Sequence, residues 1–466
     1  MRAAVRSALS VRRRIIDLEN SEAEAFGGGQ TRLLSDMGGL SVKSTNDGSG
    51  LGRGRQTVAT RAQTGERARI LHFNPAAGRG GANGQPAMRV LQVGKFYPPY
   101  RGGIESHLQA LCHELKRSVQ IEVLVASEAR RRTEGEVDGV KIKRLARLFS
   151  IGETPVCWRL ASEIRRSRNA VVHLHVPHPP ACLAYLMSGH RGPLVITWHS
   201  DIVRQKVMAR LLAPIHEAVV RRASVLIASS PNYVESSPVL SRNRDRCRVI
   251  PFGILPDGFR ARDGETITKI RQRYGRRILL AVGRMVYYKG FEFLVRAMKD
   301  IRGHLLIVGD GPLRRQLEHL AVEYGVIERI TFLGRVSQEE MVAYYHAADV
   351  FVLPSIARSE AFGVVQLEAM ACGKPVVNTA LPTGVPYVSL DGVTGITVPP
   401  ADAGALATAI SRLLDDPYLR AKLGTAGLRR AREEFNVELM GRRTLEVYRE
   451  VLAAAPIATA RNSAVL

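Results

Sequence analysis

The chain has 466 residues, of which 45% are hydrophobic and 24% charged, and its formal net charge is +24. This length allows two or three domains, and this balance excludes a wholly disordered, collagen-like or coiled-coil protein. No run of about 18 consecutive apolar residues occurs, so we expect no membrane-spanning helix. The five cysteines lie far apart without a Cys-x-x-Cys pair, which indicates reduced thiols of a cytoplasmic protein rather than a disulfide framework.

Residues 1–87 are rich in Gly, Arg, Ser and Thr and show no sustained hydrophobic period. We predict a disordered extension, because such a composition buries too little apolar surface to order a chain. A membrane-touching arm is the alternative. A signal peptide fits poorly, because Arg12, Arg13 and Arg14 interrupt any apolar run. Removing this segment should therefore leave folding and turnover nearly intact.

Residues 88–254 alternate short apolar runs with helical stretches. The first helix is expected at 104–115, after the first strand. The strands are expected at 90–93, 121–125, 171–174, 194–197, 225–228 and 249–250. Apolar strands separated by helices predict a parallel sheet covered on both faces, that is, a doubly wound Rossmann-like domain.

Residues 255–275 are predicted to be a linker, after which the alternation restarts in a second Rossmann-like domain, which we bound at 255–440. Its strands are expected at 278–282, 305–308, 330–333, 350–353, 375–377 and 396–398. Its helices are expected at 291–301, 313–324, 338–346, 363–372 and 403–414. A final helical region follows from about 416 to 453, and we expect the terminal helix and tail, 441–466, to pack back on the first domain. Two such α/β domains bind ligands in a cleft between the carboxyl ends of their sheets.

The densest motif spans 355–377 and follows an expected strand. Glu360 falls in the loop at the end of this strand. Gly363 opens a helix whose free N–H groups and dipole favour an anion. Glu368 comes five residues later, about 7.5 Å along the helix axis. Two carboxylates beside an anion-binding helix start suit a ligand that carries both hydroxyl groups and phosphate.

A second motif, at 282–290, places Arg284 and Lys289 between a strand and a helix. Two fixed cations there could neutralise a diphosphate as it leaves. No Asp-x-Asp pair occurs in the chain, so we predict no metal site and a metal-independent reaction.

A third motif, at 94–107, contains Gly102 and Gly103 at the start of a helix, where backbone without side chains can approach a ligand closely. For Lys95, Arg101 and Glu105 a structural role and a ligand contact remain equally open.

Histidines gather near two further strand ends. His199 is a candidate contact to a ligand, and Asp201 follows it closely. His173, His175 and His178 crowd a Pro-rich segment. A metal is conceivable for these three, but we favour His-Pro turns that line the floor of the cleft.

In the pattern S-x4-E-x-F-G-x4-E-A-x-A-x-G-x-P-V, Glu360 and Glu368 form an E-x7-E pair. This pattern resembles the signature of the retaining group 1 glycosyltransferases, which have the GT-B fold. The G-R-x4-K-G of Arg284 and Lys289 and the P-x3-GG-x-E around Gly102 and Gly103 match in order, so the resemblance covers about residues 88–450.

The resemblance implies a role for each matching residue. Glu360 would hold hydroxyls of the transferred sugar, and Glu368 the ribose of the nucleotide. His199 would face the transferred sugar. The diphosphate would be bound by Arg284, Lys289, Gly102, Gly103 and the backbone of Phe362, Gly363 and Val364. The base and its ribose would lie near Gly309, Arg335 and Val336. An acceptor would contact Asp201 and Tyr97.

The implied activity is transfer of a hexose from a nucleoside-diphosphate sugar to a hydroxyl group with retention of anomeric configuration. The segments 198–201 and 230–232 resemble those of bacterial mannosyl- and rhamnosyltransferases of surface polysaccharide biosynthesis, so we favour mannose as the sugar and GDP over UDP. The acceptor would be a glycan or a lipid-linked sugar. A nucleotide-sugar epimerase or another GT-B enzyme is the alternative. A basic nucleic-acid-binding protein is disfavoured, because no nucleic-acid module is present.

The charge is distributed unevenly. Residues 88–254 contain 26 basic and 13 acidic side chains, a net charge of +13. Basic clusters at 130–132, 141–147 and 165–168 could each bind an anionic membrane surface. We therefore expect a protein of the cytoplasm that associates peripherally with the inner face of the plasma membrane.

Overall fold

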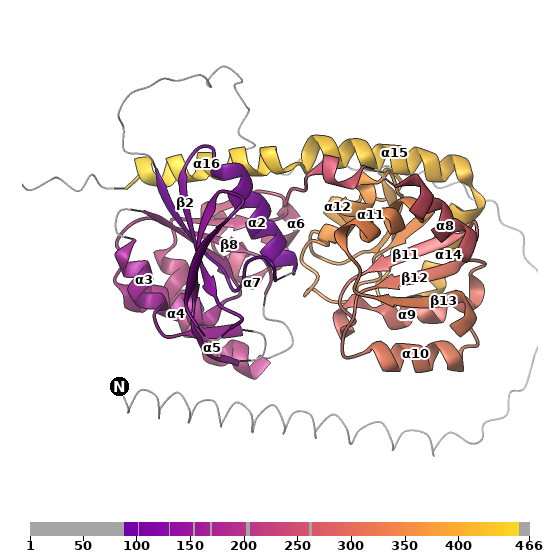
Figure 1. The fold of residues 1–466 in the computed structure, drawn as a ribbon, viewed down its shortest axis with the longest axis horizontal. Coiled ribbons are helices and arrows are strands. Elements are labelled where there is room, and N and C mark those ends of the chain that lie inside the picture. The colour runs from indigo at the N-terminus through magenta and orange to yellow at the C-terminus, as the bar shows by residue number, and fades with distance from the viewer. Residues whose placement is uncertain are drawn as a thin grey trace, which may run out of the picture. The chain divides into compact units, whose positions relative to one another are not determined.

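The structure is a computed structural model that describes residues 88–455, apart from 101, 130, 152–153, 168–169, 202–205 and 261–262. The extension predicted at 1–87 lies outside the described residues, as do Arg101, Arg130 and Arg168. Within residues 88–455 two sheets with their helices follow one another along the chain (Figure 1).

The first sheet has eight strands in the order β10-β9-β8-β7-β1-β2-β4-β3, all parallel except β3, which runs antiparallel to β4. Its strands are β1 (Arg89–Val93), β2 (Gln120–Ala126), β3 (Thr133–Val137), β4 (Val140–Leu145), β7 (Val171–Val176), β8 (Leu194–Trp198), β9 (Val225–Ala228) and β10 (Cys247–Val249). Its helices are α2 (Gly103–Leu115), α3 (Leu160–Arg166), α4 (Pro179–Ser188), α5 (Lys206–Arg222), α6 (Pro231–Ser236) and α7 (Pro238–Ser241). Strands β7 and β8 are buried along their whole length, as a sheet covered on both faces requires.

The second sheet has six parallel strands in the order β13-β12-β11-β14-β15-β16. They are β11 (Ile278–Val282), β12 (His304–Val308), β13 (Ile330–Gly334), β14 (Val350–Val352), β15 (Val376–Thr379) and β16 (Gly395–Val398). The helices are α8 (Gly264–Tyr274), α9 (Phe291–Ala297), α10 (Arg314–Glu323), α11 (Gln338–Ala347), α12 (Val364–Ala371), α13 (Val385–Val388) and α14 (Ala403–Asp415). The two doubly wound sheets confirm the predicted fold class.

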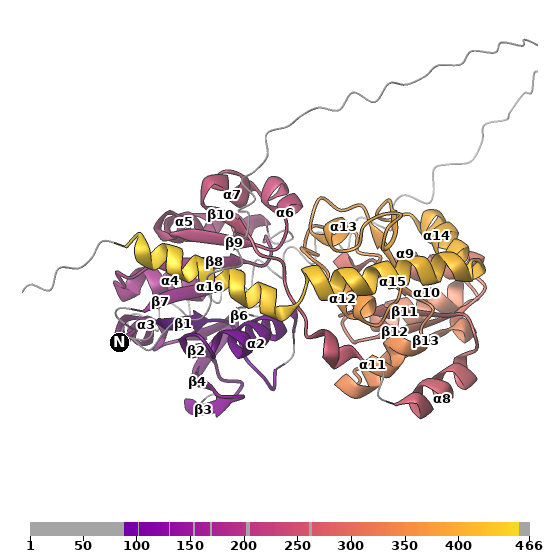
Figure 2. The same cartoon turned by 90° about the horizontal axis from the view of Figure 1, so that it is seen from above.

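The last two helices belong to different sheets. Helix α15 (Pro417–Glu434) contacts α12 and α14 of the second sheet, whereas α16 (Val437–Ala453) contacts α2 of the first. Figure 2 shows the two helices one after the other, with α16 over the strands of the first sheet. The apolar side of α16 enters the core between α2 and that sheet through Val437, Met440, Val447, Tyr448 and Val451.

The secondary structure differs from the expectation in two places. Four strands between 133 and 157 were not predicted, among them the hairpin of β5 (Arg147–Ile151) and β6 (Thr154–Cys157). The segment 255–275 is not a linker, because it contains a 3-10 turn at Pro256–Phe259 and helix α8. Asp263 caps α8 by accepting the backbone N–H of Thr266, and Ile270 is buried.

Among the described residues, no helix is both long enough and apolar enough to cross a membrane. None of the five cysteines forms a disulfide.

Candidate active site

The candidate site of the second sheet lies where its strand order reverses. Strand β11 has β12 on one side and β14 on the other, so the loops that follow β11 and β14 separate at this point, where doubly wound sheets bind ligands. Lys289 comes from the loop after β11, and Glu360 from the loop after β14. Their Nζ and Oε2 atoms are 2.6 Å apart, and both residues are more than 90% buried.

Neighbouring groups hold this ion pair in place. Ser355 Oγ donates to Glu360 Oε2 at 3.1 Å, and the Lys289 ammonium lies 5.8 Å from the centre of the Tyr288 ring. Burial by itself would lower the pKa of Lys289, but the charge of Glu360, with smaller contributions from Tyr288 and Glu368, raises it above its usual value. Lys289 is therefore a cation that is fixed before any ligand arrives.

Gly363 forms the N-cap of α12 and adopts a left-handed conformation with φ of 74°. A Cβ atom here would lie 2.7 Å from both Leu353 and Gln366, so only glycine fits. The helix therefore begins without a capping side chain, with Val364 as its first residue, and its first N–H groups are available to an anion. Phe362, just before it, is buried and packs in the core.

Glu368 lies one turn into α12 and is half-buried. Its Oε2 accepts a hydrogen bond of 2.7 Å from the hydroxyl of Tyr345. Burial raises the pKa of Glu368, and the Tyr345 hydrogen bond and the charge of Lys289 oppose this shift only in part. Its carboxylate is thus poorly solvated and suited to accepting hydrogen bonds from hydroxyl groups.

The loops after β11, β12 and β13 meet at the same edge of the sheet. Gly309 has φ of 128°, and a Cβ atom there would lie 2.0 Å from the carbonyl oxygen of Gly283. Gly309 N–H also donates to Gly334 at 2.7 Å, directly before the exposed Arg335 and the half-buried Val336. Arg284, in the loop after β11, is exposed. This edge is therefore built from tightly packed backbone with cations around it.

On the first sheet, Gly102 is the N-cap of α2, and Gly103 is its first residue. A Cβ atom on Gly102 would lie 2.3 Å from Oε2 of Glu105, whereas one on Gly103 would meet nothing within 4 Å. Burial raises the pKa of Glu105, and burial lowers that of Lys95, although each charge favours the other. Both side chains are therefore partly desolvated and close enough for each charge to affect the other.

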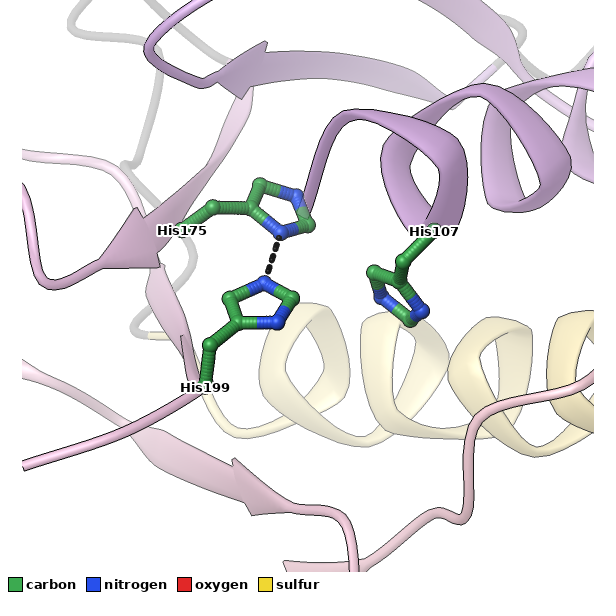
Figure 3. A group of neighbouring side chains, drawn as sticks. All are labelled: His107, His175 and His199. Atoms are coloured by element: carbon green, nitrogen blue, oxygen red, sulfur yellow. Dashed lines mark hydrogen bonds between the residues drawn. The ribbon is translucent and has the colours of Figure 1, made fainter. Parts of the chain in front are cut away.

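Histidines of three different elements meet beside this helix (Figure 3). His107 comes from α2, His175 from β7 and His199 from the loop after β8, and all three are more than 90% buried. His175 Nδ1 lies 3.0 Å from His199 Nε2. The expectation of His-Pro turns is wrong for His173 and His175, since both lie within strand β7.

A chain of buried hydrogen bonds runs from His199 to the last helix. His175 Nε2 lies 2.9 Å from Oε1 of Gln92 on β1, and Gln92 Nε2 donates to the hydroxyl of Tyr448 at 2.8 Å. The same hydroxyl lies 2.7 Å from Nδ1 of His173. Because Gln92 Oε1 can only accept, His175 carries its proton on Nε2, and His199 donates to it from Nε2. Nδ1 of His199 is therefore left as an acceptor.

Asp201 and Tyr97, the two residues predicted to contact the acceptor substrate, already have contacts within the protein. Asp201 accepts from Trp198, Ser237 and Arg358 at 2.9, 2.8 and 3.0 Å, so both of its oxygens have partners. Tyr97 is 3% exposed and lies in the core between α2 and the first sheet. Their roles toward an acceptor stay predictions.

Contacts join the ends of the two sheets. The Arg358–Asp201 ion pair links the loop after β14 to the loop after β8. The Phe252 ring has its centre 4.3 Å from that of His107, 5.2 Å from that of His199 and 5.0 Å from that of Phe362. The histidines and the start of α12 therefore share a neighbour.

Four residues of this arrangement were not singled out from the sequence as site residues: His107, Gln92, Phe252 and Tyr448. His107 had a signal, because it falls one helical turn after Gly103, on the side of α2 that is expected to face a ligand. The other three had none, since only the fold brings β1, the segment between the sheets and the last helix together.

Comparisons with known proteins agree with the predicted family. Residues 264–430 match the family model described as "Glycosyl transferases group 1", and residues 101–257 match "Glycosyltransferase Family 4". A D-rhamnosyltransferase of Pseudomonas aeruginosa is 34% identical over 75% of this chain and 92% of that protein.

An O-antigen chain mannosyltransferase C of Escherichia coli is 30% identical over 76% of this chain and 96% of its own. A GDP-mannose-dependent alpha-(1-6)-phosphatidylinositol monomannoside mannosyltransferase of Mycolicibacterium smegmatis is 30% identical over 77% of this chain and 97% of that protein. The chain belongs to the group 1 glycosyltransferases of the GT-B fold and is a glycosyltransferase.

Proposed function

We propose that this enzyme transfers mannose, or a closely related hexose, from a GDP-sugar to a hydroxyl group of a glycan or lipid-linked acceptor, with retention of anomeric configuration. The observation that carries the proposal is the buried Lys289–Glu360 pair beside the uncapped start of α12. A fixed cation, a carboxylate and an anion-binding helix start lie together at the point where the strand order of the second sheet reverses. The cation and the helix start suit the diphosphate of a nucleoside-diphosphate sugar, and the carboxylate suits its hydroxyl groups.

In this proposal the donor's diphosphate lies between Lys289, Arg284 and the N–H groups that follow Gly363. As the sugar–phosphate bond breaks, negative charge grows on the leaving diphosphate, and these groups stabilise it without having to reorient. Glu360 and Glu368 accept hydrogen bonds from the sugar and the ribose. His199 offers Nδ1 as an acceptor toward the sugar.

The reaction is proposed to need no metal ion. The positive charge that Mg²⁺ would supply comes from Arg284, Lys289 and the helix start, and the chain has no Asp-x-Asp pair to hold the ion. The acceptor's proton passes to the leaving phosphate, because no protein base is identified for it.

The preference for a GDP-sugar rests on the relatives. One is named as GDP-mannose-dependent, a second as a mannosyltransferase of the O-antigen chain, and a third as a D-rhamnosyltransferase. These names also support a glycan or lipid acceptor and a place in polysaccharide or glycolipid biosynthesis.

Association with an anionic membrane through the first domain remains part of the proposal, but several of its cations are already paired. Glu163 is buried and lies 3.4 Å from Arg132, 3.8 Å from Lys143 and 2.5 Å from Arg166. Lys143 also lies 2.5 Å from Glu122. The remaining basic side chains of these clusters would have to supply the attraction to lipid.

The deciding experiment is a thermal-shift screen with GDP, UDP and dTDP, followed by transfer assays with the matching sugar donor. A nucleotide at 100 times its Kd stabilises the folded state by about 2.7 kcal/mol. We expect the largest shift with GDP, and a product whose anomeric configuration, read by NMR, equals that of the donor. Stabilisation by UDP alone would contradict the GDP-sugar assignment and indicate a UDP-sugar donor. An epimerised free sugar nucleotide without acceptor would favour the epimerase instead.

A further inference from the structure

The three histidines of Figure 3 converge on one point from α2, β7 and the loop after β8. One ring nitrogen of each can be chosen so that all three atoms lie within 4.8 Å of one another. Nitrogens bound to a common ion at about 2.0–2.1 Å lie within about 4 Å of each other. A small rotation of the rings therefore brings the three to coordination distance.

The ring nitrogens of His107 are the observation that points to a ligand at this cluster. Both of its ring nitrogens are buried, and neither has a hydrogen-bond partner among the residues that the structure describes. Buried polar atoms of folded proteins are almost always satisfied, so we expect a ligand at one of these two nitrogens. The ring lies against Phe252, which can offer none.

We propose that His107, His175 and His199 form a binding site for a divalent transition-metal ion of the zinc class, which shares His199 with the proposed sugar site but does not involve the Lys289–Glu360 pair. His175 would bind through Nδ1, the atom that faces His199. Its Nε2 lies 2.9 Å from Gln92 Oε1, the kind of outer hydrogen bond that fixes metal-binding histidines.

The chemistry of the donor set selects the ion. Three imidazole nitrogens without a carboxylate favour Zn²⁺, Co²⁺, Ni²⁺ or Cu²⁺ over Mg²⁺ and Ca²⁺. Burial lowers the pKa of all three rings, that of His107 to about 3, so they are neutral as a ligand must be. Three protein ligands leave a fourth position open to water or a hydroxyl group.

Binding would also affect transfer, and this consequence rests on the proposed function. An ion on His199 Nε2 breaks the hydrogen bond to His175 and brings positive charge next to a sugar that itself becomes positive as its bond to phosphate breaks. We therefore expect the ion to inhibit, whereas the transfer reaction itself needs none.

The test is titration of the untagged full-length protein with Co²⁺, without donor or acceptor, followed by visible spectroscopy. We expect the intense ligand-field bands of four-coordinate cobalt at one equivalent, displaced by Zn²⁺. X-ray absorption of the zinc form should show only nitrogen or oxygen neighbours, at about 2.0–2.1 Å. Absence of saturable binding, or sulfur neighbours at about 2.3 Å from the cysteines, would overturn the proposal.

Variants locate the site. His107→Phe removes one ligand and keeps a ring beside Phe252, so we expect at least a tenfold loss of affinity. Gln92→Leu removes the outer hydrogen bond and should weaken binding 10–100-fold. His178→Phe is the matched control, because His178 is also a buried histidine but lies outside the group of three.

Circular dichroism shows whether each variant folds. If His107→Phe does not, the absorption spectrum of the unmodified protein decides alone. Equal cobalt affinity in folded His107→Phe and wild-type protein would exclude the site. Finally, Zn²⁺ should lower wild-type turnover at least tenfold, and EDTA should restore it. An enzyme that proves inactive toward every donor leaves the binding experiment intact, so failure of the proposed function and failure of the metal site are distinguishable.

Discussion

On the first sheet the polar side chains of the site are mainly buried histidines, whose pKa values burial lowers, whereas on the second they are a lysine and two glutamates. The three histidines of Figure 3, Lys289 and Glu360 are all more than 90% buried, and Glu368 is half-buried. The difference lies in their partners. Lys289 has Glu360 at 2.6 Å. Among the described residues, the ring nitrogens of His107 have no hydrogen-bond partner, and those of His175 lie beside another histidine and an amide. The charge of Glu360 outweighs burial at Lys289 and raises its pKa, whereas burial prevails at the three histidines and lowers theirs.

The largest expected effect tests the charged side. Replacing Lys289 by Ala removes a preorganised cation from the leaving diphosphate, so kcat should fall about 10²–10³-fold while KM changes less. Steady-state kinetics on folded protein measure it. Lys299→Ala is the control, because Lys299 is exposed and only approaches Asp300 at 3.8 Å. Near-normal turnover of the Lys289 variant would remove this residue from the site.

Lowering the pH should change the free energy of unfolding in opposite directions through the histidines of the first sheet and through Glu368 of the second. In the unfolded chain the histidines take up protons near pH 6.5, but the folded state keeps His107 and His173 neutral down to about pH 3. Each such histidine therefore lowers the free energy of unfolding by up to about 1.4 kcal/mol per pH unit below 6.5. The raised pKa of Glu368 acts oppositely, since protonation on acidification relieves its buried charge.

Urea unfolding at pH 8, 7, 6 and 5 measures the balance. We expect stability to fall steadily below about pH 6.5, and His107→Phe to reduce the slope by about one proton. Stability that stays level between pH 7 and 5 would mean that these rings are charged in the folded protein.

The close backbone packing of the charged side gives a third prediction. Gly309→Ala should cost about 1–3 kcal/mol or more in the free energy of unfolding, because its φ is unfavourable and its Cβ would overlap Gly283. Gly264→Ala, at the start of α8 with nothing within 4 Å, should instead be neutral or stabilise by about 0.4–1 kcal/mol. Chemical denaturation compares the two. Equal effects would show that this edge can relax.

The smallest effect concerns the neutral side. Tyr448→Phe deletes the hydroxyl that Gln92 and His173 share, leaving buried groups unsatisfied at a cost of about 1–3 kcal/mol. Tyr418→Phe is the control, since Tyr418 is 79% exposed and should change stability by no more than about 0.5 kcal/mol. If the Tyr448 variant is as stable as wild type, water has replaced the hydroxyl.

The sequence predicts the charged side better than the neutral one. The predicted bounds of strand β11 agree with the structure at both ends. Lys289, Glu360 and Gly363 are predictable as site residues because they lie within short motifs directly after apolar strands. Strand β4 was missed because Lys141, Lys143 and Arg144 obscure the alternation of Val140 and Ile142, although Val140, Ile142 and Leu145 all face the core. Helix α8 was missed because its start is polar and its apolar stripe holds few residues.

The neutral side could not be assembled from motifs. Its rings come from a helix, a strand and the loop after a second strand. Its outer hydrogen bonds come from Gln92 and Tyr448, which are 356 residues apart in the chain. No local pattern of residues specifies that His107 and His175 will meet. Only the order of strands in the sheet does so.

The return of α16 to the first sheet has a consequence for how the protein is made. Gln92 is synthesised early, but its partner Tyr448 emerges on the order of tens of seconds later at about 5–20 residues per second. Until then, the face of the first sheet and α2 that Val447, Tyr448 and Val451 later cover stays open to solvent. A fragment that ends at residue 254 keeps that face uncovered for good. Attempts to divide the enzyme between its two sheets must therefore supply residues 437–453 to the first half.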